Sequence, residues 1–450
     1  MRSIRRTLRG RASPFKSLLT TRSLSLQILK SVQVAQPPSS STGMASSKTS
    51  LINALHLQNA SYADAGTKIR LSILATALVD ALGGPPEFHT RFTFPLVTKM
   101  TPNRNFGLPP GVWTDDTSMT LCLGRSIATY TPKDQGNVAR QGGFDEADQL
   151  EAYMKWRGEG VLSATGHCFD VGNTIAQALS IYAGYPNEPE KALAQIRLTL
   201  SGEYNAGNGS LMRILPVGLA YWRDEQAARK YARRSSETTH PTSVCLEACE
   251  MWTGAITKIM QATTEAVEYT KLDLIEYISS FPYQSDKFRS VLTFPDNTPS
   301  KPDNKEELEA YYQEHHPLLR LIKSTQEGVK IKPEHIEEGF SYALPSVQKL
   351  PSTGYVVHTL IAALYCFFAT KTFEEGAIMA VNLGSDADTV GAVYAGLAGC
   401  WYAAGEDSEV GQAVFWSERV KDWRFGLVKR DLVEQVADEL VTFQQTAQEG

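Results

Sequence analysis

The sequence lacks the patterns that mark several common protein classes. Its 450 residues contain no uncharged apolar run of about 20 residues, the length needed to span a membrane as a helix. The nearest candidate, YVVHTLIAALYCFFAT, is shorter and contains His358, and it is predicted to be a buried core helix. The six cysteines form no C-x-x-C pair and have no histidine at ligand spacing, which argues against a zinc site and predicts reduced core cysteines. Alternating polar and apolar runs are almost absent, so an all-α fold is predicted.

Acidic residues are missing from the first 50 positions, although those positions hold nine of the 44 Lys and Arg residues. The rest of the chain therefore has 35 basic and 49 acidic side chains, a net charge of about −14 with His neutral. An acidic body argues against direct nucleic-acid binding and suits a protein that binds cations.

Residues 1–35 are rich in Arg, Ser and Leu, a composition typical of a mitochondrial transit peptide, and they predict a location in the mitochondrial matrix. A disordered basic tail would have the same composition. Residues 1–50 are therefore expected to be a targeting or disordered basic segment followed by a linker. Met44 lies in that linker and offers a second start site, which would give a cytosolic form.

Residues 51–450 are expected to form a single all-α domain. Apolar residues recur at helical spacing in AGTKIRLSILATALVDALGG, which ends at paired glycines. Thr372 and Glu375 have the spacing of a capping box at the start of another helix. Residues 281–345 are rich in Pro, Asp and Lys and are predicted to be a surface insertion, in which His315 and His316 are expected to be solvated.

Two clusters of oxygen-bearing side chains precede apolar, helix-like runs. Their members are Thr114, Asp115 and Asp116 in WTDDT, and Asp386, Asp388 and Thr389 in GSDADT. Asp386 and Asp388 converge only if Gly384 and Ser385 form a turn and the helix begins near Thr389. One Asp or Thr ahead of an apolar run is more often a helix N-cap than a metal ligand. A cap needs one side chain rather than three, so the two clusters together favour a metal site.

The chemistry of these clusters predicts a pair of divalent cations. A helix dipole stabilises a carboxylate by only ~0.3–1 kcal/mol, which is less than the cost of burying it without a counter-charge. Ligand sets made only of oxygen suit Mg²⁺, Mn²⁺ or Ca²⁺. Four carboxylates are more than one Mg²⁺ normally takes from protein, so a two-metal site with ions ~3.5–4 Å apart is predicted.

Two glycine-containing segments have the character of ligand-binding loops. NAGNGSLMRILPVGL places Gly207–Ser210 ahead of an apolar run, and CFDVGNT places Asp170 and Asn173 between helical segments. Glycines let a backbone approach a phosphate closely, and N–H groups at a helix start bind anions. The spacing matches neither the P-loop nor the dinucleotide-binding fingerprint, so a plain turn is the alternative.

Six motifs in this order resemble the ADP-ribosylglycohydrolase family: DALGGPPE, WTDDT, FDVGNT, GNGSLMR, TTHP and NLGSDADTVGA. The resemblance implies a single-domain orthogonal bundle of helices with a binuclear Mg²⁺ or Mn²⁺ site at the base of a cleft. It implies a hydrolase that removes ADP-ribose from modified protein side chains, or from related small ADP-ribosyl compounds, by cleaving the bond at ribose C1″. A monomer is expected.

Carried over residue by residue, the resemblance also implies roles for the matching positions. The metal ligands would be Thr114, Asp115, Asp116, Asp386, Asp388 and Thr389. The catalytic residues would be Glu87, Asp116 and Asp386, with Glu87 or Asp386 assisting proton transfer. Asp170, Gly172 and Asn173 would line the distal ribose, and Asn208, Gly209, Ser210 and Met212 would cradle the diphosphate. His240 would lie near the ADP-ribose, although alone it would be assigned a structural role.

Two positions depart from the family pattern. Val79 and Ser385 stand where the family commonly has glycine, and neither change removes an oxygen ligand. The alternatives are a catalytically inactive ADP-ribose-binding or crystallin-like relative, and a metal-dependent pyrophosphate hydrolase. The linkage stays open among ADP-ribosylated arginine, ADP-ribosylated serine, poly(ADP-ribose) and O-acetyl-ADP-ribose.

Overall fold

The computed structural model describes residues 54–131, 142–262, 268–327 and 330–446. The basic segment and linker predicted for residues 1–50, Met44 included, lie outside them. Helices joined by turns and loops make up the described residues, with isolated β-bridges and no β-strand among them, so the prediction of an all-α fold is confirmed. The described residues form one compact unit. Within the described ranges, no helix combines the length and the apolar character needed to cross a membrane.

The elements are η1 (Leu55–Leu57), α2 (Ala65–Gly83), α3 (Asp115–Thr129), α4 (Glu146–Glu159), α5 (Asn173–Ala183), α6 (Pro189–Leu200), η2 (Glu203–Asn205), α7 (Leu215–Ala220), α8 (Glu225–Glu237), α9 (Ser243–Gln261), α10 (Lys271–Ser280), α11 (Asp286–Leu292), α12 (Lys305–His315), α13 (Pro317–Gln326), α14 (Pro333–Glu337), α15 (Val356–Ala369), α16 (Phe373–Val381), α17 (Ala387–Trp401), α18 (Glu409–Val414), α19 (Glu418–Gly426) and α20 (Arg430–Thr446).

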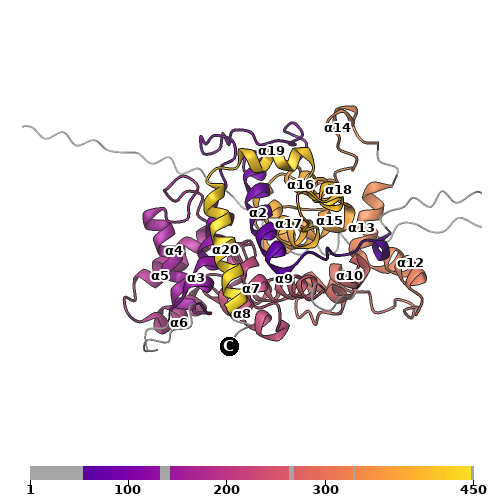
Figure 1. The fold of residues 1–450 in the computed structure, drawn as a ribbon. Coiled ribbons are helices and arrows are strands. Elements are labelled where there is room, and N and C mark those ends of the chain that lie inside the picture. The colour runs from indigo at the N-terminus through magenta and orange to yellow at the C-terminus, as the bar shows by residue number, and fades with distance from the viewer. Residues whose placement is uncertain (1–53, 132–141, 263–267, 328–329, 447–450) are drawn as a thin grey trace, which may run out of the picture. The chain divides into compact units, whose positions relative to one another are not determined.

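Helices α2 and α17 pack side by side and are buried over most of their length (Figure 1). Small residues let the two backbones approach closely. A Cβ atom added to Gly399 would lie 2.7 Å from the Cβ of Ala75, and one added to Gly391 would lie 2.9 Å from Cγ1 of Val79. Val79, the bulkier residue noted in the sequence, therefore fills the space that Gly391 leaves open.

The same close packing fixes the ends of these helices. A Cβ atom added to Gly83, the last residue of α2, would lie 2.5 Å from the Cα of Asp388 in the first turn of α17. Helix α20 packs against both α2 and α3, and α3 also contacts α17. The segment before α3 is anchored by Trp113, whose indole N–H donates to the carbonyl of Val428 at 2.8 Å. Helices α2, α3 and α17 thus meet at one place.

Local signals in the sequence hold in the structure. Thr372 and Glu375 form the predicted capping box, with each side chain accepting from the backbone N–H of the other. Gly384 and Ser385 form the predicted turn in left-handed conformations with φ of 66° and 63°. Helix α17 begins at Ala387, slightly earlier than expected.

The segment at residues 281–345 carries helices α11 to α14. Leu318 and Ile322 of α13 are buried, and this helix packs against α15. The expectation of a solvated His316 is wrong: the residue is fully buried, and its Nε2 lies 3.0 Å from the carbonyl oxygen of Leu292. The apolar face of the helix that follows His316 carries it into the core.

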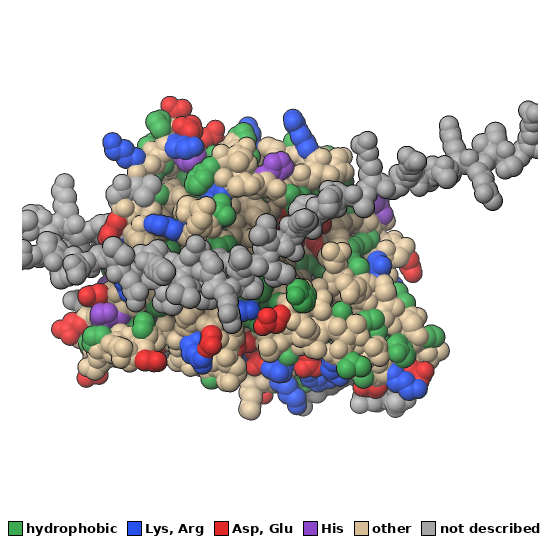
Figure 2. All heavy atoms as spheres, turned by 180° about the vertical axis from the view of Figure 1, so that it is seen from behind, with side chains coloured by type: hydrophobic (Ala, Val, Ile, Leu, Met, Phe, Trp, Pro, Cys, Tyr) green, Lys and Arg blue, Asp and Glu red, His purple; other side chains and the backbone are tan. Residues whose placement is uncertain are grey.

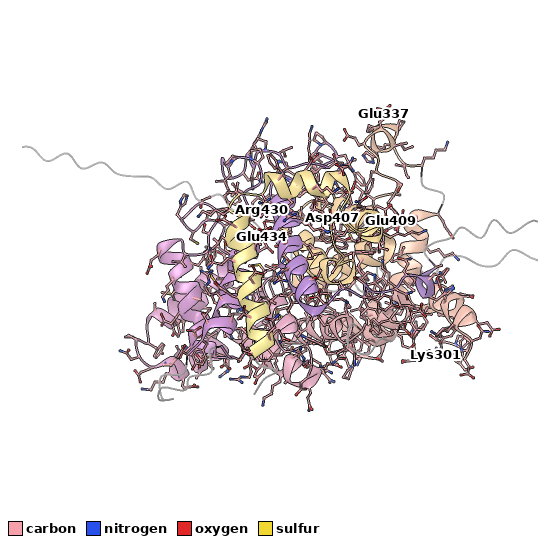
Figure 3. All side chains as sticks on the ribbon, in the orientation of Figure 1. Lys301, Glu337, Asp407, Glu409, Arg430 and Glu434 are labelled. Carbon is pink, nitrogen blue, oxygen red and sulfur yellow. The ribbon has the colours of Figure 1, made fainter. Side chains whose placement is uncertain are left out.

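Most charged side chains lie at the periphery. Of the residues labelled in Figure 3, Asp407 and Glu409 are exposed, and Arg430 and Glu434 on α20 are partly exposed and form an ion pair at 3.5 Å. On the face shown in Figure 2, acidic and basic side chains of the described residues are interspersed. The side chain of Lys271 is buried instead, and its Nζ donates to the backbone carbonyls of Phe367 and Thr370 at the end of α15.

Gly83→Ala should lower the free energy of unfolding by about 1–3 kcal/mol, because the new methyl group would overlap the backbone of α17 and force the helices apart. Urea denaturation of the purified variant measures this change. Gly158→Ala is the matched control in α4, where no atom lies within 4 Å of an added Cβ. It should be neutral or stabilising by up to about 1 kcal/mol, and equal losses in both variants would contradict the close packing of α2 on α17.

Candidate metal centre

The two aspartate clusters meet in the folded chain. Thr114 Oγ1, at the head of α3, lies 3.1 Å from an oxygen of Asp116 and 3.4 Å from an oxygen of Asp388. Thr389 Oγ1, in the first turn of α17, lies 3.3 Å from the same Asp116 oxygen. All four residues are buried. Segments that are far apart in the sequence therefore present their oxygens to one point.

Helix capping does not account for these residues. Thr114 and Asp386 occupy the N-cap positions of α3 and α17, yet neither side chain makes a capping bond to a backbone N–H of its helix. Asp386 instead accepts from the amide of Asn208 at 2.6 Å. The oxygens are turned toward the junction of the helices, where a cap would turn them toward the backbone.

Asp80 is a member of this junction to which the sequence analysis gave no role. It is fully buried at the end of α2 and accepts from the backbone N–H and the hydroxyl of both Thr114 and Thr117. Oxygens of Asp80, Asp116 and Asp388 lie within 4.8 Å of one another. The signal in the sequence was a single carboxylate inside the apolar run ALVDAL, where solvent cannot reach it.

Glu87 and Asp170 extend the cluster toward the solvent. Their carboxylate oxygens and one from Asp388 lie within 4.8 Å of one another. The Glu87 loop is docked on the turn before α17, because Phe88 N–H donates to the carbonyl of Ser385 and Ser385 N–H donates to the carbonyl of His89, both at 2.7 Å. Asp388 thus belongs to both carboxylate groups.

Burial and mutual repulsion favour protonation of these acids. Burial, followed by the charges of Asp388, Asp170 and Asp386, raises the pKa of Glu87 to about 12. Burial and neighbouring carboxylates likewise hold the pKa of Asp116 and Asp388 well above the ordinary value. Within the described residues, no ion pair of a Lys, Arg or His involves any of these carboxylates.

The arrangement fits a divalent cation. Asp116 Oδ1 and Glu87 Oε2 are buried without a hydrogen-bond partner, which is costly for a carboxylate oxygen unless a cation or a proton satisfies it. Carboxylate and hydroxyl oxygens supply all the donors, the set that Mg²⁺, Mn²⁺ and Ca²⁺ prefer. The clustered carboxylates can therefore hold metal.

A cleft of about 240 Å³ opens above the carboxylates. It is lined by Glu87, Asp115, Asp170, Gly172, Asn173, Thr174, Ile175, Gly207, Asn208, Gly209, Met212, His240, Gly354, Asp386, Asp388 and Thr389. Most of the side chains assigned to metal or ligand from the sequence are thus brought together around one space. Thr114 and Asp116 lie beneath the floor of the cleft, and both are almost fully buried.

The GNG loop (Gly207–Gly209) forms one wall of the cleft and is tied to its floor. The Asn208 amide donates to Asp386 and to Thr359 Oγ1, and its backbone N–H donates to the carbonyl of Gly354. A Cβ atom added to Gly209 would lie 2.9 Å from both His240 and Ile175, so this position requires glycine. The loop is therefore a fitted part of the site rather than a plain turn.

Ser210 is placed differently from its neighbours in this loop. It is fully buried, and its hydroxyl accepts from Ser236 Oγ at 2.8 Å and from the thiol of Cys249. The side chain therefore faces the core, and Ser210 is absent from the described residues that line the cleft.

Comparisons with known proteins agree with this geometry. Residues 61–450 match the model of the ADP-ribosylglycohydrolase family. The ADP-ribosylarginine hydrolase Tri1 of Pseudomonas putida is 27% identical over 354 residues, which cover 78% of this chain and 75% of that protein. The ADP-ribosyl-[dinitrogen reductase] glycohydrolase of Rhodospirillum rubrum is 26% identical over 338 residues, 74% of this chain and 84% of that protein. A solved structure titled ADP-ribosylglycohydrolase-related protein complex gives a TM-score of 0.52 at 29% identity and covers 84% of this chain and 99% of its own.

Mg²⁺ should raise the melting temperature more at about pH 8 than at about pH 6, because protonation of the clustered carboxylates removes negative charge that would attract a cation. Burial raises the pKa of Asp80 to about 6 and that of Asp170 to about 7. Without metal, protonation of these groups therefore stabilises the fold at low pH, and this contribution is lost as the pH rises through those values. Thermal unfolding in Mg²⁺ and in EDTA at both pH values measures the difference.

Asp116→Asn should remove most of the Mg²⁺ effect, whereas the same change at the exposed Asp407 should keep it. An Mg²⁺ effect that is equal at both pH values, or that persists in Asp116→Asn, would speak against a carboxylate metal centre.

Proposed function

This chain belongs to the ADP-ribosylglycohydrolase family, and we propose that it is a metal-dependent hydrolase that removes ADP-ribose from modified protein side chains. The bond cleaved would be the one at ribose C1″. The observation that carries this proposal is the clustering of buried carboxylates at a cleft whose wall is the GNG loop. Oxygens of Asp388 lie within 4.8 Å of those of Asp116 in one group and of Glu87 in the other.

The floor of the cleft would hold two Mg²⁺ or Mn²⁺ ions. Their ligands would be Thr114, Asp115, Asp116, Asp386, Asp388 and Thr389. Bound cations would neutralise the carboxylates and act as Lewis acids toward the ribose. Asp80 is a positioning residue in this scheme, because it accepts both the N–H and the hydroxyl proton of Thr114 and so leaves the lone pairs of that hydroxyl free.

Glu87 is the group best suited to hold a proton near the scissile bond. Its Oε2 has no hydrogen-bond partner, the residue lines the cleft, and the surrounding carboxylates favour its protonated form. Asp386 is a second candidate for proton transfer, since it also lines the cleft. The side-chain amide of Asn208, a residue of the GNG loop that forms the adjoining wall, donates to Asp386 and fixes its orientation.

The walls would bind the rest of the ADP-ribose. Asp170, Gly172 and Asn173 line the cleft at the start of α5 and would contact the distal ribose. The backbone N–H groups of Gly209 and Ser210 would contact the diphosphate, since glycine allows close approach of an anion to the chain.

We further propose that the modified residue is arginine, as in the name of the Pseudomonas relative, ADP-ribosylarginine hydrolase Tri1. Phe88 and Phe169 directly adjoin Glu87 and Asp170, which line the cleft, and the ring of Phe106 joins them at centroid distances of 6.1 and 5.5 Å. Aromatic faces beside carboxylates suit a guanidinium group, which stacks on rings and pairs with acids.

An ADP-ribose release assay on arginine-, serine- and polymer-linked substrates tests the function. The wild type should release intact ADP-ribose from the arginine-linked substrate with Mg²⁺ and not with EDTA. Asp116→Asn and Asp388→Asn should lower the rate by more than about 100-fold, since loss of a supporting group alone costs metal sites up to that much. Asp407→Asn is the surface control. AMP with ribose 5-phosphate as products, or ADP-ribose binding without turnover, would refute the proposal.

Phe88→Leu should raise KM for ADP-ribosylarginine by about fivefold, because a cation–π contact contributes about 1 kcal/mol. Phe88→Tyr keeps the aromatic face and should stay close to the wild type. The inhibition constant of free ADP-ribose, which lacks the guanidinium, should be unchanged in both. An equal loss in the Leu and Tyr variants would rule out a role for the ring.

A further inference from the structure

His240 lies against the GNG loop with one edge of its ring toward the cleft. It is 2% exposed, and it lines the cleft together with Gly207 and Gly209. A Cβ atom added to Gly209 would lie 2.9 Å from Cε1 and 3.3 Å from Nε2 of the ring, and one added to Gly207 would lie 3.5 Å from Nε2. The Nε2 edge therefore faces the loop proposed to hold the diphosphate.

Arg213 sits behind this loop and is fully buried. Its Nη1 donates to the carbonyl of Gly209, and its Nη2 donates to Thr238 Oγ1 at 3.2 Å and to Thr239 Oγ1 at 2.8 Å. A guanidinium has donors only, so each of these threonine oxygens must act as an acceptor toward Arg213.

The contact between Thr239 and His240 determines which ring nitrogen of the histidine is protonated. Thr239 Oγ1 lies 2.8 Å from Nδ1 of His240. Among the described residues, Arg213 and His240 are the hydrogen-bond partners of the Thr239 hydroxyl. Because the oxygen accepts from Arg213, the hydroxyl proton can be donated only to Nδ1 of His240. A proton on Nδ1 would leave the buried hydroxyl proton unpaired, which is unfavourable.

We infer that Arg213 and Thr239 form a relay that fixes His240 as the Nε2–H tautomer, and that this N–H donates to an anionic phosphate oxygen held beside Gly207 and Gly209. The identity of the ligand rests on the proposed function. The tautomer itself follows from contacts within this chain. Arg213 and Thr239 are thus positioning residues that act through His240.

Electrostatics keeps the ring neutral. Burial, assisted by the charge of Arg213, lowers the pKa of His240 to about 3. The ring therefore offers a hydrogen-bond donor without a charge, and this donor does not change across the physiological pH range. In the ligand-free chain, the neighbours of the ring at Thr239, Gly207 and Gly209 supply no counter-ion for a charged imidazolium.

The tautomer is measured by nitrogen NMR on ligand-free protein labelled at histidine, with His240 assigned as the signal lost in His240→Gln. The expected result is one protonated nitrogen at Nε2 and one hydrogen-bonded, unprotonated nitrogen at Nδ1. An Nδ1–H tautomer or an imidazolium in the wild type would overturn the relay.

Matched threonine variants test whether the relay contributes to ADP-ribose binding. Thr239→Val removes the hydroxyl and should abolish the hydrogen-bonded signature at Nδ1 and weaken ADP-ribose binding, measured by calorimetry, about tenfold. Thr239→Ser keeps the hydroxyl and should restore both. Thr238→Val loses a bond from the same arginine without touching the ring, so it should keep the Nδ1 signature and controls for stability.

Unchanged ADP-ribose affinity in Thr239→Val would overturn the role of the relay in binding. A wild type that shows the Nε2–H tautomer but does not bind ADP-ribose would instead refute the proposed function and the phosphate contact, while the tautomer would stand. Failure of the two ideas can therefore be told apart.

Discussion

Repulsion among buried carboxylates is the constraint on which the rest of this structure depends. Asp80, Asp116 and Asp388 come from three helices. Their carboxylate oxygens lie within 4.8 Å of one another, and all three residues are buried. Such a group is stable only when protons or cations balance it. The close packing of α2 on α17, and of α3 on both, holds the carboxylates together in spite of this repulsion. Cation binding at these oxygens would therefore be coupled to folding.

Two buried arginines of the core do not neutralise these carboxylates. Arg91 and Arg213 are both buried, and both donate to backbone carbonyls instead of to the carboxylates of the cleft. Arg91 binds the carbonyl oxygens of Leu383 and Leu350 beside the turn before α17, and Arg213 binds that of Gly209. Each guanidinium thus fixes a loop that borders the cleft, while the acidic floor keeps its capacity for divalent cations.

Different parts of the cleft are lined by different kinds of side chain. Acids on the floor would supply cation ligands, and glycines in the wall would allow the backbone to approach an anion, while aromatic rings adjoin two of the acidic residues. Asn208 connects floor and wall, because its amide donates to Asp386 while its backbone N–H donates to Gly354. A change at one of these places is expected to be felt at the other.

Sequence alone determined what depends on neighbours along the chain: the helices, the capping box at Thr372, the turn at Gly384, and the clustering of oxygens in two short motifs. The order of six motifs added the family. Tertiary structure decided what depends on contacts between distant segments. It drew Asp80 into the acidic junction, turned Ser210 into the core and buried His316. Periodicity and spacing describe which face of a helix is apolar, but the partner of that face, and so the surroundings of each polar side chain, is set by packing across the whole fold.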